Sequence, residues 1–333
     1  MQDKTLYTQL AEQIGAGESK VVSRLFETLL DESEAKLVLA AAPPATAEEL
    51  AQRTGIDTAR IGTMIDGLFR KGLLFKSKKP DGIRYYRVRH VLQFHDATAV
   101  MHDPPPKMLD LWKEYTRTEW EEQSKVYEAL LPQAAMRVVP INVSLEPNSQ
   151  ILASDDVSKL IDGARNIAVT KCSCRVIDGA CGKPVEVCMQ LDRAADYSIE
   201  RGTGRKLSRE EALRMLERCE EEGLVHVAEN KQGVGNVICN CCRDCCINWP
   251  SVRTGLGKFV SPSRFRAVVD GDECNGCELC IDRCFFDAMK MVDGDTLAAV
   301  DEEKCMGCGV CRVACVVDAI SMQVVRPQEF VPA

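Results

Sequence analysis

The sequence predicts an α+β, multidomain protein, and two observations carry that prediction. The N-terminal third has apolar residues at helical spacing, followed by a short hairpin pattern. All 18 cysteines come after residue 171, and 17 of them fall in dense groups typical of small metal-bound domains. With 333 residues, several domains are expected. The expected segments are a helix-and-hairpin domain (1–90), a helical connector (91–135), a cysteine-rich α/β domain that binds a metal or cluster (136–260), and a domain built on a cysteine repeat (261–333).

Composition limits the function classes. The formal net charge of −8 argues against a general nucleic-acid binder. No stretch resembles a secretion signal or is apolar for long enough to cross a membrane. Because disulfides are rare in reducing compartments, 18 cysteines in such a chain indicate metal ligation. We therefore expect a cytoplasmic protein of an organism that lives with little oxygen.

The N-terminal segment reads as helices closed by a hairpin. Thr46 and Glu49 form a capping box, Asp57 caps a longer helix, and Gly72 ends it. Helices are expected over 19–30, 32–42, 46–53 and 57–70, and strands over 73–75 and 85–88.

This order of elements resembles the winged helix-turn-helix family. The resemblance implies that the helix over 57–70 reads a DNA groove and that cations of the hairpin contact phosphates: Lys76, Lys78, Lys79 and Arg84. Residues 43–90 hold ten Lys or Arg against five Asp or Glu, which favours DNA. Asp57 and Asp66 would repel phosphate. The alternative is a docking module, or a surface through which two copies form a homodimer.

The connector begins at a run of prolines, 104–106, which cannot lie inside a helix. One long helix is expected over 107–131. His90, His95 and His102 lie near this joint and are expected to be surface or capping residues, since no cysteine is close to them in sequence.

The C-terminal segment holds two copies of C-x2-C-x2-C-x3-C, offset by 31 residues. A [4Fe–4S] cluster needs four thiolates, three from one tight loop and the fourth from the other copy. Gly276 and Gly307 stand where the backbone must turn sharply. The alternative is two tetrahedral zinc sites.

The repeat resembles the bacterial two-cluster ferredoxin family. The resemblance implies that one cluster is held by Cys274, Cys277, Cys280 and Cys315. It implies that the other is held by Cys305, Cys308, Cys311 and Cys284. Phe285 and Val316 stand where that family usually has proline. After Ser261 there are seven Lys or Arg and thirteen Asp or Glu, a charge suited to docking on a basic redox partner.

The middle segment holds nine clustered cysteines. The first group is Cys172, Cys174, Cys181 and Cys188. The second group is Cys239, Cys241, Cys242, Cys245 and Cys246. A strand over 167–170 is expected to present Cys172 and Cys174 on one face. Cys239, Cys242 and Cys245 repeat the three-ligand spacing of a ferredoxin loop, with a fourth ligand from the first group.

Three interpretations of the middle segment stay open: one or two additional iron–sulfur clusters, a structural zinc with spare thiols, or a reactive dithiol or cluster site that performs chemistry. Basic residues near the thiols, Arg243 among them, either lower a thiol pKa or are surface charges. Cys219, inside a helix, is expected to be an ordinary core residue.

These patterns favour an iron–sulfur electron-transfer protein, a subunit of an oxidoreductase system. Electrons would pass through two C-terminal [4Fe–4S] clusters to or from a partner oxidoreductase. One alternative is a redox-responsive transcription regulator, and another is a reductase whose active site lies in the middle domain. No dinucleotide fingerprint is present, so flavin or nicotinamide would belong to a partner.

Overall fold

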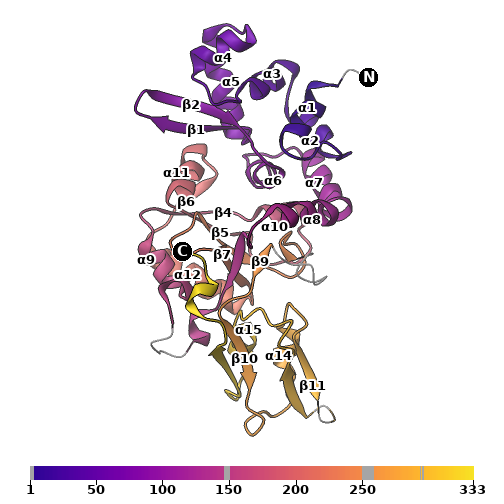
Figure 1. The fold of residues 1–333 in the computed structure, drawn as a ribbon, viewed down its shortest axis with the longest axis vertical. Coiled ribbons are helices and arrows are strands. Elements are labelled where there is room, and N and C mark those ends of the chain that lie inside the picture. The colour runs from indigo at the N-terminus through magenta and orange to yellow at the C-terminus, as the bar shows by residue number, and fades with distance from the viewer. Residues whose placement is uncertain (1–3, 146–150, 250–258, 293, 295) are drawn as a thin grey trace. The chain divides into compact units, whose positions relative to one another are not determined.

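The computed structural model describes residues 4–145, 151–249, 259–292, 294 and 296–333. The chain divides into two compact units (Figure 1). The first comprises 1–123, 173–179 and 201–203, and the second comprises 124–172, 180–200 and 204–333. The mixture of helices and strands agrees with the α+β prediction. The four expected segment boundaries remain predictions.

The first unit consists of helices and one antiparallel hairpin. The predicted capping box at Thr46 and Glu49 is present, and the Asp57 side chain caps the following helix. The elements are α1 (Leu6–Gln13), α2 (Val22–Leu29), α3 (Glu32–Ala40), α4 (Ala47–Thr54), α5 (Thr58–Lys71), β1 (Leu74–Lys79), β2 (Gly82–Arg87), α6 (Val91–Ala99), α7 (Pro106–Thr118) and α10 (Ser173–Asp178). The helix α8 (Trp120–Leu130) crosses the boundary between the units.

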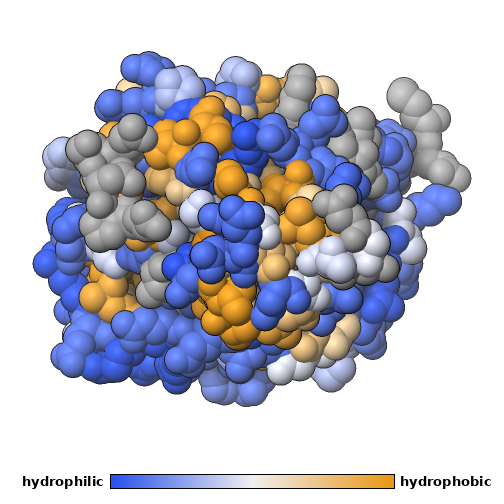
Figure 2. Space-filling model, turned by 90° about the horizontal axis from the view of Figure 1, so that it is seen from below, coloured by the Kyte–Doolittle hydropathy of each residue, from blue (hydrophilic) through white to orange (hydrophobic). Residues whose placement is uncertain are grey.

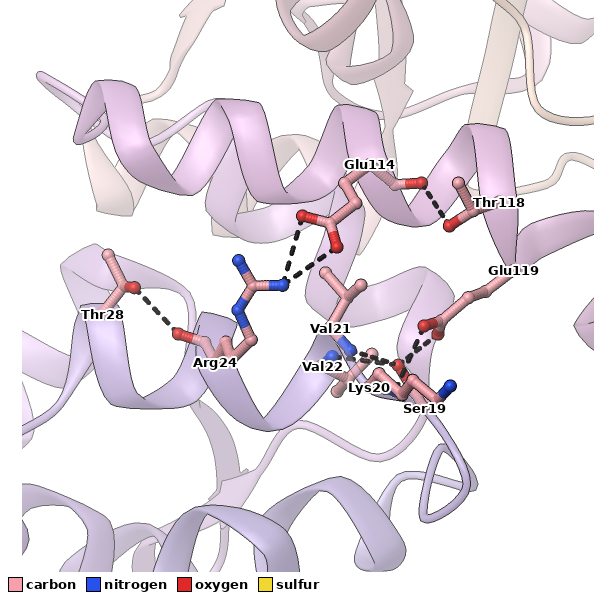
Figure 3. A network of polar contacts seen from close by, with 9 residues as sticks. All are labelled: Ser19, Lys20, Val21, Val22, Arg24, Thr28, Glu114, Thr118 and Glu119. Atoms are coloured by element: carbon pink, nitrogen blue, oxygen red, sulfur yellow. Dashed lines mark hydrogen bonds and ion pairs between the residues drawn. The ribbon is translucent and has the colours of Figure 1, made fainter.

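The prediction of a single helix over 107–131 is wrong, because the chain forms two helices, α7 and α8, with a break at Glu119. Figure 3 shows the cause. The Glu119 carboxylate accepts hydrogen bonds from the Ser19 hydroxyl and from the backbone N–H of Lys20, at 3.1 Å for the latter. One turn earlier, Glu114 forms an ion pair with Arg24. These contacts tie the end of α7 to the start of α2, and a helical period cannot reveal them.

The histidines of the connector differ from one another. His90 caps α6 by accepting a hydrogen bond from the N–H of Gln93, and His102 is exposed, as predicted. The prediction is wrong for His95, whose side chain is buried. Its ring packs edge-on against Trp112 at 5.1 Å, and its Nδ1 lies 2.8 Å from the Asp96 carboxylate. Its position on the inner face of α6 explains the burial.

The second unit is organised around a seven-stranded sheet. The strand order is β6-β4-β5-β8-β7-β3-β9, antiparallel except for the β3–β9 pair. Its strands are β3 (Met136–Val139), β4 (Ile167–Lys171), β5 (Glu186–Leu191), β6 (Gly204–Lys206), β7 (Val225–Glu229), β8 (Val237–Cys241) and β9 (Val260–Ser261). The helices of this region are α9 (Val157–Gly163), α11 (Asp192–Arg201) and α12 (Arg209–Glu221). The hairpin β7–β8 leads into the second cysteine group.

The C-terminal part of this unit has two short antiparallel sheets. They pair β10 (Phe265–Val269) with β13 (Ile320–Val324), and β11 (Met289–Val292) with β12 (Leu297–Val300). The short helices α14 (Leu279–Asp282) and α15 (Val310–Ala314) pack together. Figure 2 looks from below and shows hydrophobic patches among hydrophilic residues. Exposed apolar side chains of this part include Leu279, Val313 and Val316.

Backbone hydrogen bonds join the C-terminal part to the sheet region. The N–H of Ile141 donates to the carbonyl of Cys308, and the N–H of Ser263 donates to that of Met306, both at 3.0 Å. A buried ion pair between Arg264 and Asp155 adds to this junction. In the described part of the chain, no helix combines the length and the apolar character needed to cross a membrane.

Candidate metal centres

Two cavities of the C-terminal part are lined by cysteines. The first is lined by Cys274, Cys277, Cys280 and Cys315, and the second by Cys284, Cys305, Cys308 and Cys311. Each cavity therefore takes three cysteines from one copy of the repeat and one from the other. The structure brings together the same two groups of four that the ferredoxin resemblance implied.

The two copies of the repeat have the same backbone geometry. Gly276 and Gly307, 31 residues apart, have φ angles of 70° and 66°. A Cβ atom at Gly307 would lie 2.1 Å from the carbonyl oxygen of Phe265, so only glycine fits there. The N–H groups of Cys274 and Cys305 each donate to the carbonyl of the residue four positions earlier, at 3.1 and 3.0 Å. The loops are therefore two versions of one structure.

The thiols of both cavities suit a metal cofactor. Burial raises the pKa of Cys308 to about 12 and that of Cys280 above its usual value, and neighbouring cysteines of the same cavity raise both further. Gathered thiols of this kind bind metal as thiolates, whose negative charge the metal ions compensate. The N–H of Ala288 donates to the Cys284 sulfur at 3.3 Å. Hydrogen bonds of this kind influence the reduction potential of iron–sulfur clusters. The residues present therefore fit a thiolate-bound cluster.

In the middle segment, three cysteines converge. The sulfur atoms of Cys181, Cys242 and Cys245 all lie within 4.8 Å of one another. Cys242 and Cys245 follow the end of β8 and are buried, whereas Cys181 comes from the loop after α10 and is half-buried. Burial raises the pKa of Cys245 to about 12. The first and second groups therefore meet, as the sequence predicted, and we call this trio the Cys181 site.

The Cys181 site adjoins the second cysteine cavity. Trp249 donates from Nε1 to the carbonyl of Cys242 at 2.9 Å, and its ring meets that of Phe286 edge-on at 5.3 Å. Phe286 lines the second cavity. Arg243 binds both carboxylate oxygens of Asp287, at 2.8 and 2.9 Å. Sequence reasoning noted Arg243 as a charge near thiols but had no signal for this contact, which depends on tertiary structure.

The other middle cysteines lie in different surroundings. Cys239 and Cys241 are on β8, and the neighbouring thiols of Cys239 and Cys246, together with burial, raise the pKa of Cys241 well above its usual range. The backbone N–H of Cys172 donates to Val185 at 2.7 Å. The expectation that a strand presents Cys172 and Cys174 on one face is wrong, because β4 ends at Lys171 and Cys174 lies in α10. Cys174 and Cys172 remain predicted ligands.

The last two middle cysteines, Cys188 and Cys219, lie within a strand and a helix. Cys188 lies on β5 and accepts a hydrogen bond at its sulfur from Gln190, at 3.3 Å. Cys219 is buried inside α12, as predicted.

The hairpin of the first unit holds the cations predicted to contact DNA. Arg84 forms ion pairs with Asp81 and Glu49, and the Lys76 ammonium lies 3.9 Å from the centre of the Phe69 ring. Lys78 and Lys79 are exposed. Two of the four cations are thus engaged within the protein. DNA binding and homodimer formation stay predictions.

The comparison with protein families gives one match. The family described as "4Fe-4S binding domain" matches residues 298–321, which include the cysteines of the second repeat copy. No curated protein and no solved structure matches the chain significantly. The C-terminal region is therefore ferredoxin-like, and the match indicates at least one 4Fe-4S cluster and, in general terms, a role in electron transfer.

Proposed function

We propose that the protein is a cytoplasmic electron-transfer protein that carries electrons to or from a partner oxidoreductase. Two [4Fe–4S] clusters would be held in the two C-terminal cavities, one in each. A third iron–sulfur cluster would be held at the Cys181 site, with Cys172 or Cys174, which remain predicted ligands, as the fourth thiolate. The clusters supply reversible one-electron chemistry when bound.

The observation that carries this proposal is that each cavity is lined by three cysteines of one repeat copy and by one cysteine of the other copy. Cys315 lines the cavity of the first copy, and Cys284 lines the cavity of the second. Two-cluster ferredoxins have this arrangement. It supports two clusters in close proximity: burial and the other thiols of the second cavity raise the pKa of Cys311, and Cys280 of the first cavity is near enough to add to that increase.

The protein's own residues would perform three tasks. Cavity thiols, once ionised, hold the metal, and backbone N–H groups such as that of Ala288 stabilise the sulfur charge. Packing of Trp249 against Phe286 keeps the Cys181 site beside the second cavity and fills the intervening space. This proximity supports electron exchange between the middle segment and the C-terminal part.

Acidic residues around the first cavity favour a basic partner. Asp272, Glu273 and Glu278 are exposed beside its cysteine loop, and Asp282 follows in α14. Exposed charges of one sign raise the rate at which an oppositely charged partner associates. We therefore propose that the partner docks here through a basic surface.

The test is a metal analysis of variants purified without oxygen. Cys277→Ala removes a predicted ligand of the first cluster and is expected to lose about four irons per chain. Cys245→Ala is expected to lose the iron of the middle site and to leave the C-terminal clusters intact. Cys219→Ala is the matched control, because Cys219 is buried in α12 outside both sites. Zinc in place of iron at the Cys181 site would contradict the electron-transfer role of the middle segment.

A further inference from the structure

A second group of thiols lies on the sheet, beside the Cys181 site but separate from it. Cys239 and Cys241 are two positions apart in β8, so their side chains project from the same face. The thiols of Cys239 and Cys246 lie beside that of Cys241 and, together with burial, raise the pKa of Cys241 well above its usual range. Cys241 and Cys246 are only 5% and 6% exposed. The buried Cys241 sulfur therefore has two other cysteine sulfurs beside it.

The register of the sheet adds a fourth cysteine. Strand β5 pairs with β8 in antiparallel order, with Met189 opposite Ile238. One step beyond these two pairs, the same register would bring Cys188 opposite Cys239. Directly opposite residues of an antiparallel pair project to the same face, with Cβ atoms about 4.5–5.5 Å apart. Cys188 is therefore on the face that carries Cys239 and Cys241.

Side-chain hydrogen bonds also link β5 to both neighbouring strands. The Asn240 side chain donates to the carbonyl of Val187 at 2.7 Å, which holds the end of β8 beside β5. On its other side, Cys188 is opposite Thr170 of β4, whose hydroxyl donates to the Cys188 carbonyl at 3.3 Å. Cys188 is thus held in a central strand of the sheet.

Two adjacent residues divide this group from the Cys181 site. Cys241 is the last residue of β8, and Cys242 is the first residue beyond it. Successive residues of an extended chain project in opposite directions. Cys242 accordingly joins Cys181 and Cys245, whereas Cys241 joins Cys239 and Cys246. The segment 239–246 therefore supplies thiols both to the Cys181 site and to the group around Cys241.

We propose that a second metal centre of the middle segment, distinct from the Cys181 site, is held by four thiols: Cys188, Cys239, Cys241 and Cys246. Four thiolates with no further ligand match a closed site, which takes either zinc or an iron–sulfur cluster. Binding releases the thiol protons and links β5 to β8 through the metal. This site goes beyond the electron-transfer function and does not depend on it.

The experiment uses full-length protein purified without oxygen and four variants. They are Cys241→Ala, Cys245→Ala, the double variant, and Cys219→Ala as the control. Zinc, iron and acid-labile sulfide are measured per chain, and Mössbauer spectra assign the iron. We expect Cys241→Ala to lose about one zinc or about four irons and to keep the metal of the Cys181 site. Cys245→Ala should lose the metal of the Cys181 site and keep the metal bound by the group around Cys241. The double variant should lose both.

Two results would overturn the proposal. Full metal content in Cys241→Ala, equal to that of Cys219→Ala, would show that this group binds no metal. Loss of all middle-segment metal in either single variant would show one shared centre in place of two. Because Cys241 is buried, its variant could fail to fold, and Cys188→Ala then decides, since Cys188 is half-buried and belongs to the same group. The C-terminal iron stays constant throughout, so these outcomes are separate from the test of the electron-transfer role.

Discussion

The C-terminal repeat and the middle segment both gather cysteines, but they do so in different ways. In the repeat, three thiols of each cavity come from one loop of seven residues, 274–280 or 305–311. In the middle segment, Cys181 and Cys242 are far apart in sequence and meet only because the sheet and its loops bring them together. Ligands supplied by a loop can be read from their spacing, whereas ligands supplied by a sheet depend on strand order and register.

The largest effect is expected from variants that test which repeat cysteines hold the same cluster. Cys274→Ala and Cys315→Ala should remove the same cluster, about four irons each, and leave the same EPR signal in the reduced protein. Cys284→Ala should leave a different signal, that of the first cluster. Equal residual signals from Cys274→Ala and Cys284→Ala would mean that each copy holds its own cluster, contrary to the cavities seen here.

A smaller effect is expected from the backbone of the loops. Gly307 has a φ of 66°, at which alanine is strained, and an alanine Cβ would lie 2.1 Å from the Phe265 carbonyl oxygen. Gly307→Ala should therefore lower the unfolding free energy by at least about 2 kcal/mol. Gly294→Ala is the control, since its φ is 68° but its Cβ would meet nothing within 4 Å. It should cost about 1 kcal/mol. Denaturant titration of the holoprotein measures both. Equal losses would contradict the close approach at Gly307.

Charge around the first cavity can be tested with small redox probes. Replacing Asp272, Glu273 and Glu278 with their amides should slow oxidation of the reduced protein by hexaammineruthenium(III), a cation, several-fold at low salt. Oxidation by ferricyanide, an anion, should become faster, and added salt should reduce both effects. Stopped-flow absorbance measures the rates. Equal changes with the two probes would mean that charge does not govern access to this cavity.

The smallest effect concerns the ion pair that joins the two cysteine-rich regions. Arg243 and Asp287 are 43% and 61% exposed, so solvent screens their attraction. A double-mutant cycle with Arg243→Ala and Asp287→Ala should give a coupling energy below about 1 kcal/mol. Thermal denaturation at two salt concentrations measures it. A larger coupling, unaffected by salt, would indicate that the pair is a main support of the junction.

Local chemistry was predictable from the sequence, and tertiary contacts were not. The capping box at Thr46 was correctly predicted because it depends on a residue three positions away. The turns at Gly276 and Gly307 have the positive φ expected of glycine. By contrast, the helix break at Glu119 results from contacts with residues about a hundred positions earlier.

The candidate sites show the same division. Spacing and resemblance indicated which repeat cysteines belong together, and the cavities have those members. Spacing alone placed Cys239 with Cys242 and Cys245, but the structure places Cys181 with that pair and gives Cys239 to the group around Cys241. The alternation of side chains along β8 is the signal that separates Cys239 from Cys242. That signal could be used only once the strand was known to run through Cys241.

The most direct test of the electron-transfer account is iron, acid-labile sulfide and zinc per chain in protein purified without oxygen. Two C-terminal clusters and a third at the Cys181 site predict at least about 12 irons, with an equal amount of sulfide. About 8 irons together with zinc would contradict a redox site in the middle segment. About 4 irons would contradict the paired clusters of the C-terminal region, on which the proposed function depends.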